Sequence, residues 1–181
     1  MGSKAIKLVT PELRLSYCHL FTPRAMAEGG KAKYSVSILI PKNDTKTVKA
    51  INDAVAKCIA ENPEKLKGKK GLKHPLRDGD EERESPEYAD HYFLGASSTD
   101  KPVVLDESKQ PILEPREAYS GMYGRVSINF FAYDTAGNKG VGAALNAVMK
   151  TADGEPLGSS YTEDDAVEDF GGTKDEDEDL L

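Results

Sequence analysis

The sequence has little of what membrane, secreted and disulfide-bonded proteins need. Its 181 residues include no tryptophan and two cysteines, and no apolar run approaches the roughly 18 residues of a membrane span. The N-terminus does not show the basic-then-apolar pattern of a signal peptide, so we expect the protein to stay where it is made. Cys18 and Cys58 each lie in an apolar pattern, which favours two buried thiols in a reducing compartment over a disulfide.

Signatures of catalysis are also missing. The three histidines and two cysteines lack zinc-site spacing, and residues 67–71 lack the GxxxxGK[ST] pattern of a phosphate-binding loop. The sequence therefore predicts no enzyme, no metal and no cofactor. One alternative stays open, because the acidic residues between Asp78 and Glu87 could hold the metal ion of a nuclease. A solvated acidic loop is the commoner explanation for such a cluster.

Charge is present but unevenly placed. Residues 162–181 contain ten of the 31 acidic residues against Lys174 alone, so this segment carries −9 and the rest of the chain +2. A segment this acidic and this poor in apolar residues cannot offset its chain entropy, so we expect a disordered acidic tail. Residues 65–77 hold six basic residues and no acid. We therefore predict one domain over residues 1–161, with a charged excursion at about 62–87, and a tail over 162–181.

The apolar pattern predicts a mainly β protein. Alternation indicates strands at 6–10, 13–21, 34–40, 88–97, 102–105, 123–133 and 141–149. Asp44 is placed to cap one helix that runs to about Ala60, with apolar residues at helical spacing. Evenly spaced strands with one helix and long loops favour a small β-barrel over a parallel α/β sheet.

The strand at 125–133 has two different faces. One face is an ordinary core face formed by Val126, Ile128, Phe130 and Ala132. The other combines a cation, polar side chains and aromatic rings: Arg125, Ser127, Asn129, Phe131 and Tyr133. Aromatic rings on a polar strand face form a platform on which unpaired bases can stack. The alternative is that Phe131 and Tyr133 cover a second small core beneath the 62–87 excursion.

The tail suggests two activities. A polyanion tethered to a basic body competes with nucleic acid for any positive groove, and salt weakens both interactions. The tail also carries apolar residues within its charge, which suit a basic-rimmed apolar pocket on a partner protein. The alternatives are a plain solubility tail, or an acidic scaffold or DNA mimic that binds proteins and ignores oligonucleotides.

Several segments together resemble a family of bacteriophage single-stranded-DNA-binding proteins. They are Leu15-Ser-Tyr17, Phe21-Thr-Pro23, YSVSILIPKND at 34–44, YSGMYGR at 119–125, NFFAY at 129–133, GNKGV at 137–141 and DGEPLG at 153–158. The resemblance covers about residues 6–160. The tail is similar in its acidic character but not in its sequence. This family is similar in design to the single-stranded-DNA-binding protein of T7-type phages, whose tail ends in an aromatic residue. Here the last residues are Leu180-Leu181.

The resemblance implies an OB-type five-stranded barrel that binds single-stranded DNA during phage replication and recombination, in the cytoplasm of the infected bacterium. Replication or recombination proteins would read the tail, no membrane is involved, and a homo-oligomer stays open. We expect the DNA-binding residues to be Lys33, Lys67, Lys69, Lys70, Arg77, Tyr92, Arg125, Asn129, Phe131 and Tyr133. The expected partner-binding residues are Phe170, Asp175, Glu176, Asp177, Glu178, Asp179, Leu180 and Leu181.

Overall fold

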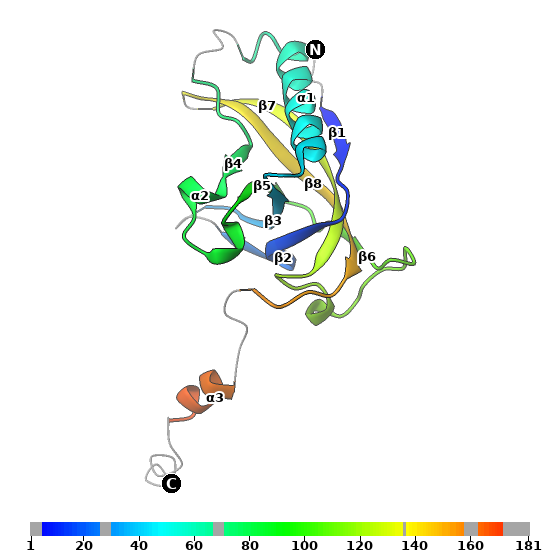
Figure 1. The fold of residues 1–181 in the computed structure, drawn as a ribbon, viewed down its shortest axis with the longest axis vertical. Coiled ribbons are helices and arrows are strands. Elements are labelled where there is room, and N and C mark those ends of the chain that lie inside the picture. Colours follow the sequence, from blue (N-terminus) through cyan, green and yellow to red (C-terminus); the bar gives the residue numbers. More distant parts are fainter. Residues whose placement is uncertain (1–4, 26–29, 67–70, 136, 158–162, 172–181) are drawn as a thin grey trace.

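The computed structural model describes residues 5–25, 30–66, 71–135, 137–157 and 163–171. Its strands are β1 (Ile6–Val9), β2 (Leu13–Ala25), β3 (Ala32–Pro41), β4 (Leu76–Asp78), β5 (His91–Ser98), β6 (Val103–Leu105), β7 (Tyr123–Thr135) and β8 (Asn138–Ala152). Its helices are α1 (Thr45–Glu61), α2 (Gly79–Glu82) and α3 (Glu163–Asp169), with 3-10 turns η1 (Pro86–Tyr88) and η2 (Pro115–Glu117) (Figure 1). Within the described ranges no helix is long and apolar enough to cross a membrane.

Five of the strands close into a ring. The antiparallel pairs are β2 with β3, β3 with β5, and β7 with β8. A short parallel pairing joins β5 to β8, and pairing at Leu13 and Arg14 joins β2 to β7. The remaining strands extend the ring: β1 lies beside β7, β4 beside β5, and β6 beside β8. The predicted mainly β, OB-type arrangement of five strands is confirmed.

The core lies inside this ring, and strand alternation fills it as predicted. On β7 the side chains of Val126, Ile128 and Phe130 are fully buried, whereas the ring of Phe131 is 36% exposed. Successive side chains of a strand point to opposite faces, so neighbouring phenylalanines have opposite environments. The two faces of this strand are those the sequence predicts.

Helix α1 packs beside β1 and β7 and begins and ends close to where the sequence predicts (Figure 1). The Thr47 N–H donates to the Asp44 side chain over 3.2 Å, which caps the first turn. At the other end the Asn62 side chain donates to the Cys58 carbonyl over 2.7 Å. Ile51, Val55 and Cys58 are buried, so this helix contributes its apolar face to the core.

The pairing of β2 with β3 shifts register twice, between Ser16 and His19 and between His19 and Arg24, and the first shift breaks the predicted alternation. Ser16 pairs with Ser37 and His19 with Ser35, so three steps along β2 match two along β3. This β-bulge inserts one residue, and side chains beyond it change face. Leu20 is therefore buried in the core, while Tyr17 and His19 turn outward.

The charged excursion is built into the fold more firmly than we expected. Leu66 is buried in the core, and residues 76–78 form β4 against β5. The Lys73 N–H donates to the Lys139 carbonyl over 2.9 Å, and the Val141 N–H to the Lys73 carbonyl over 3.0 Å. A Cβ at Gly140 would lie 2.4 Å from the Lys73 oxygen, so this close contact needs glycine. Apolar residues spaced among the charges allow the excursion to pack.

The acidic segment also differs in part from expectation. We predicted disorder throughout 162–181, whereas Glu163–Asp169 forms helix α3. Ala166, within this helix, has a high helix propensity. Val167 and Phe170 are exposed, Phe170 at 73%. The expected partner residues Asp175–Leu181 lie outside the described residues.

Candidate nucleic-acid interface

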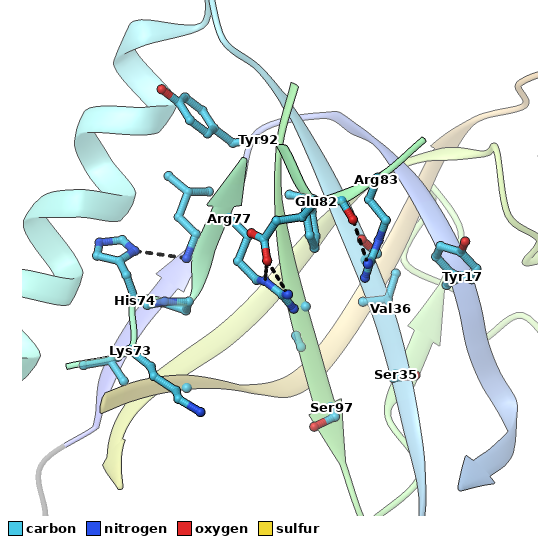
Figure 2. Close-up of a pocket in the computed structure, with 18 of the residues that line it drawn as sticks. Tyr17, Ser35, Val36, Lys73, His74, Arg77, Glu82, Arg83, Tyr92 and Ser97 are labelled. Atoms are coloured by element: carbon cyan, nitrogen blue, oxygen red, sulfur yellow. Dashed lines mark hydrogen bonds and ion pairs between the residues drawn. The ribbon is translucent and has the colours of Figure 1, made fainter. Parts of the chain in front are cut away.

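A groove of about 1170 Å³ lies on the outer face of β3 and β5. Its floor is formed by small residues, Ser35 and Ser37 on β3 and Gly95 and Ser97 on β5. Side chains of β2 stand on one side, and residues 73–77 with the end of the β7–β8 hairpin on the other, whereas Arg83 lies at the same end as Tyr17 (Figure 2). The small floor residues leave room for a flat ligand between walls of aromatic and basic side chains.

Tyr17 lines the groove from the bulge in β2. Its φ is +46°, a left-handed conformation that is costly for a residue with an aromatic side chain. Its ring is 48% exposed, so the apolar core does not repay this strain. A strained backbone that presents an exposed aromatic ring to a groove is typical of a functional position.

Basic side chains gather where β2 and β3 form a hairpin. Arg24 and Lys33 are directly opposite each other in the pairing register, so both side chains stand on one face, and both residues are exposed. Like charges placed opposite each other destabilise a strand pair, and a bound anion would relieve that repulsion. Nearby, burial and the Arg24 charge lower the pKa of His19, which also lines the groove.

The β4–α2 segment brings two arginines over one aromatic ring. The Cζ atoms of Arg77 and Arg83 lie 5.2 and 4.7 Å from the ring centre of Phe93. Arg77 also donates from Nε to the Glu82 carboxylate over 2.9 Å (Figure 2). This hydrogen bond lowers the pKa of Glu82 and raises that of Arg77. In the free protein, Arg77 is thus paired before any ligand arrives.

The acidic cluster is engaged in similar pairs. Lys42 Nζ lies 2.7 Å from a carboxylate oxygen of Asp78 and 2.7 Å from one of Asp80. Hydrogen bonds from Lys42 lower the pKa of both carboxyls, and those bonds raise the pKa of Lys42. No group of three or more potential ligands in the described part of the chain is placed to hold a metal ion. The geometry of these ion pairs gives the nuclease alternative no support.

A second small core does lie beneath the excursion, but it has other members than we considered. Leu39, Tyr88 and Phe93 are buried together, and Leu157 packs against them. The Tyr88 hydroxyl donates to Ser37 Oγ over 3.1 Å. Phe131 and Tyr133 are not part of this cluster. Because Leu157 packs here, the chain leaves the body towards the tail close to the groove.

Residues 6–181 match the family model of the single-stranded-DNA-binding protein of Enterobacter phage Enc34. The chain belongs to this family. A curated relative, "Putative protein p50" of Acyrthosiphon pisum secondary endosymbiont phage 1, is 31% identical over 159 residues, which cover 83% of this chain and 85% of that protein.

Solved structures of two phage proteins share the fold. The Enc34 single-stranded-DNA-binding protein in complex with single-stranded DNA superposes with a TM-score of 0.69 at 26% identity, covering 87% of this chain and 96% of that one. The single-stranded-DNA-binding protein gp2.5 of bacteriophage T7 has a TM-score of 0.59 at 15% identity, covering 91% and 94%. The second likeness is one of fold, and it agrees with the T7-type design that the motifs suggest.

The structure brings only some of the predicted DNA-binding residues together in the groove. Arg77, Tyr92 and Tyr133 line it, and Lys33 stands on the same face opposite Arg24. The ring of Phe131 lies 6.4 Å from that of Tyr133, at the edge of the groove. It rests on Gly142, where a Cβ would be 2.7 Å from the ring.

Other predicted residues lie elsewhere. Arg125 donates from Nε to the Thr10 carbonyl over 2.9 Å, and Asn129 contacts the Asn146 side chain at 3.5 Å. Both residues are on the outward face of β7 and do not line the groove. The basic residues Lys67, Lys69 and Lys70 fall outside the described residues.

Several groove residues escaped the sequence analysis. They are Tyr17, His19, Arg24, Lys73, Arg83 and Phe93. Arg24 had a usable signal, because two consecutive glycines at positions 29 and 30, between two strand patterns, predict a hairpin that would bring Arg24 near Lys33. Tyr17 and His19 had none, since strict alternation places them on the same face as Leu13 and Leu15, and a bulge does not show in the apolar pattern.

Proposed function

We propose that this protein binds single-stranded DNA without sequence preference along the groove over β3 and β5. The observation that carries the proposal is the exposed, strained Tyr17 in a groove bordered by basic side chains, in a chain of this family. Bases would stack on Tyr17 and at the Phe131–Tyr133 edge, each worth about 1–3 kcal/mol. Phosphates would contact Arg24, Lys33, Lys73 and Arg77.

The position of the groove in the ring supports the same conclusion. OB-type proteins bind oligonucleotides on the face of their second and third strands, with the loops between strands 1 and 2 and between strands 4 and 5 on either side. In the ring these strands are β3 and β5, and the flanking hairpins are β2–β3 and β7–β8. The groove occupies that face and lies between those hairpins.

The tail adds regulation to this proposal. Its −9 charge would compete with DNA for the basic groove, and DNA would release it for replication or recombination proteins of the infected bacterium. Phe170 and the terminal leucines would enter an apolar pocket on such a partner. Removing residues 162–181 should therefore tighten DNA binding at low salt, and this gain should shrink as salt rises.

A titration with labelled oligonucleotides tests the main proposal. Full-length protein should bind a dT oligomer strongly and the matching duplex weakly, and log affinity should fall linearly with log salt. Removing a charge from the groove tests the phosphate contacts. Arg24→Gln should reduce the slope of log affinity against log salt concentration by about 0.7. Failure to bind at low salt would favour a protein-binding scaffold. Loss of the oligomer in magnesium but not in EDTA would favour a nuclease.

A further inference from the structure

We propose that the groove contains a subsite for one unpaired nucleobase, in which the base stacks on the guanidinium of Arg83 beside the ring of Tyr17. This inference rests on the proposed function, and it goes further by assigning a base contact to an arginine. A basic side chain in such a groove is ordinarily expected to bind phosphate. The surroundings of Arg83 indicate a different use.

Arg83 has a rigid support beneath it. Its Cζ lies 4.7 Å from the ring centre of Phe93 and 5.9 Å from that of Tyr88. These two rings are buried, with Phe93 3% exposed, and meet edge to face at 5.3 Å. Guanidinium groups are attracted to the faces of aromatic rings, so this pair supports the Arg83 guanidinium against the second core. The residue itself is exposed, which leaves the side away from Phe93 accessible.

Arg77 shows by contrast why the subsite belongs to Arg83. Both arginines lie over Phe93, but Arg77 is tied through its N–H groups to the carboxylate of Glu82. Arg83 donates to the main-chain carbonyl of Glu82 over 3.4 Å, a long and weak hydrogen bond. Arg83 is thus held against the ring of Phe93, while no ion pair in the described part of the chain fixes its orientation.

Tyr17 supplies the neighbouring ring. Its centroid lies 6.3 Å from that of Tyr88, the residue that also borders Arg83. Figure 2 shows Tyr17 and Arg83 at the same end of the groove, one from β2 and the other from the segment after α2. An aromatic ring and a supported guanidinium in one place offer two flat surfaces to a base. Every base has such a face, so the subsite tolerates any sequence.

The test separates base contacts from phosphate contacts through the ligand. The variant Arg83→Lys keeps the charge but lacks the planar surface, and it is titrated in the full-length protein against a dT oligomer and an abasic oligomer of equal length. We expect about tenfold weaker binding of the dT oligomer. Binding of the abasic oligomer should change less than twofold, and the salt slope should stay the same for both ligands.

Arg24→Lys is the matched control. It makes the same exchange at another groove arginine, one that lies opposite Lys33 and, among the described residues, does not lie over an aromatic ring. It should change the affinity for both ligands by the same factor, because a phosphate contact does not depend on whether a base is present. If Arg83→Lys lowers the affinity for the dT and abasic oligomers equally, or lowers neither, the proposed subsite is wrong. Thermal melts check that each variant is folded. If Arg83→Lys melts early, Arg83→Gln replaces it, and binding of the dT oligomer must again weaken more than binding of the abasic oligomer. If the wild-type protein binds neither ligand, the proposed function itself fails.

Discussion

The outward face of β7 and the groove over β3 and β5 both carry cations and aromatic rings, but they use them differently. On β7, Arg125 donates to the Thr10 carbonyl, and Asn129 and Ser127 each contact Asn146 of β8. In the groove, Arg24 faces another cation and Tyr17 holds a strained, exposed conformation. Side chains that are already bonded within the protein must give up those contacts to bind DNA. Exposure alone is therefore a poor guide to a binding surface.

The largest expected effect is a difference in stability between truncations on the inner and outer faces of β7. Phe130→Ala should lower the free energy of unfolding by about 3–5 kcal/mol, because it leaves a cavity in the core. Phe131→Ala removes a ring that is one-third exposed and should cost less than about 1 kcal/mol. Denaturant unfolding monitored by circular dichroism measures both. Equal losses would mean that the two faces of this strand are not distinct.

The next effect compares the groove with β7 directly. Tyr17→Asn should weaken binding of single-stranded DNA by about 1–3 kcal/mol, because it removes a stacking ring. Stability should not fall, since asparagine tolerates a positive φ better than tyrosine. Arg125→Gln is the control on β7, and it should reduce affinity much less. A larger loss in the Arg125 variant would place the DNA on β7 instead of in the groove.

A smaller effect in the opposite direction should follow from freeing a groove cation. Glu81 and Glu82 both line the groove, but Glu82 is the one bound to Arg77. Both Gln variants remove one negative charge, so Glu82→Gln should tighten DNA binding up to about fivefold more than Glu81→Gln. Salt-dependent anisotropy titrations measure this difference. If it persists in an Arg77→Gln background, the ion pair is not its cause.

The smallest effect is a dependence on pH. The pKa of His19 is lowered, so the imidazole is neutral at pH 7 and becomes a cation as the pH falls through that pKa. A phosphate nearby favours the charged form, so affinity should rise a few-fold between pH 7 and pH 5. His19→Gln should reduce this rise. His91→Gln, at a histidine that does not line the groove, should leave the rise unchanged.

The sequence by itself determined the β content, helix α1 and the two faces of β7. These depend on local periodicity and on capping by Asp44, and both are properties of a short stretch of chain. The family also followed from the sequence, because several short motifs occur in a fixed order. Charge counting further separated an acidic tail from a basic body, since net charge depends on composition and not on conformation.

Only the tertiary structure decided which surface carries the candidate site. A bulge of one residue in β2 turned Tyr17 and His19 outward, and ring closure brought β2, the 73–83 segment and the β7–β8 hairpin around one groove. The tertiary structure also decided which charged side chains are already paired, such as Arg77 with Glu82. The physical reason is that bulges and ion pairs depend on neighbours distant along the chain or on the exact register of a strand. Periodicity along the sequence contains neither kind of information.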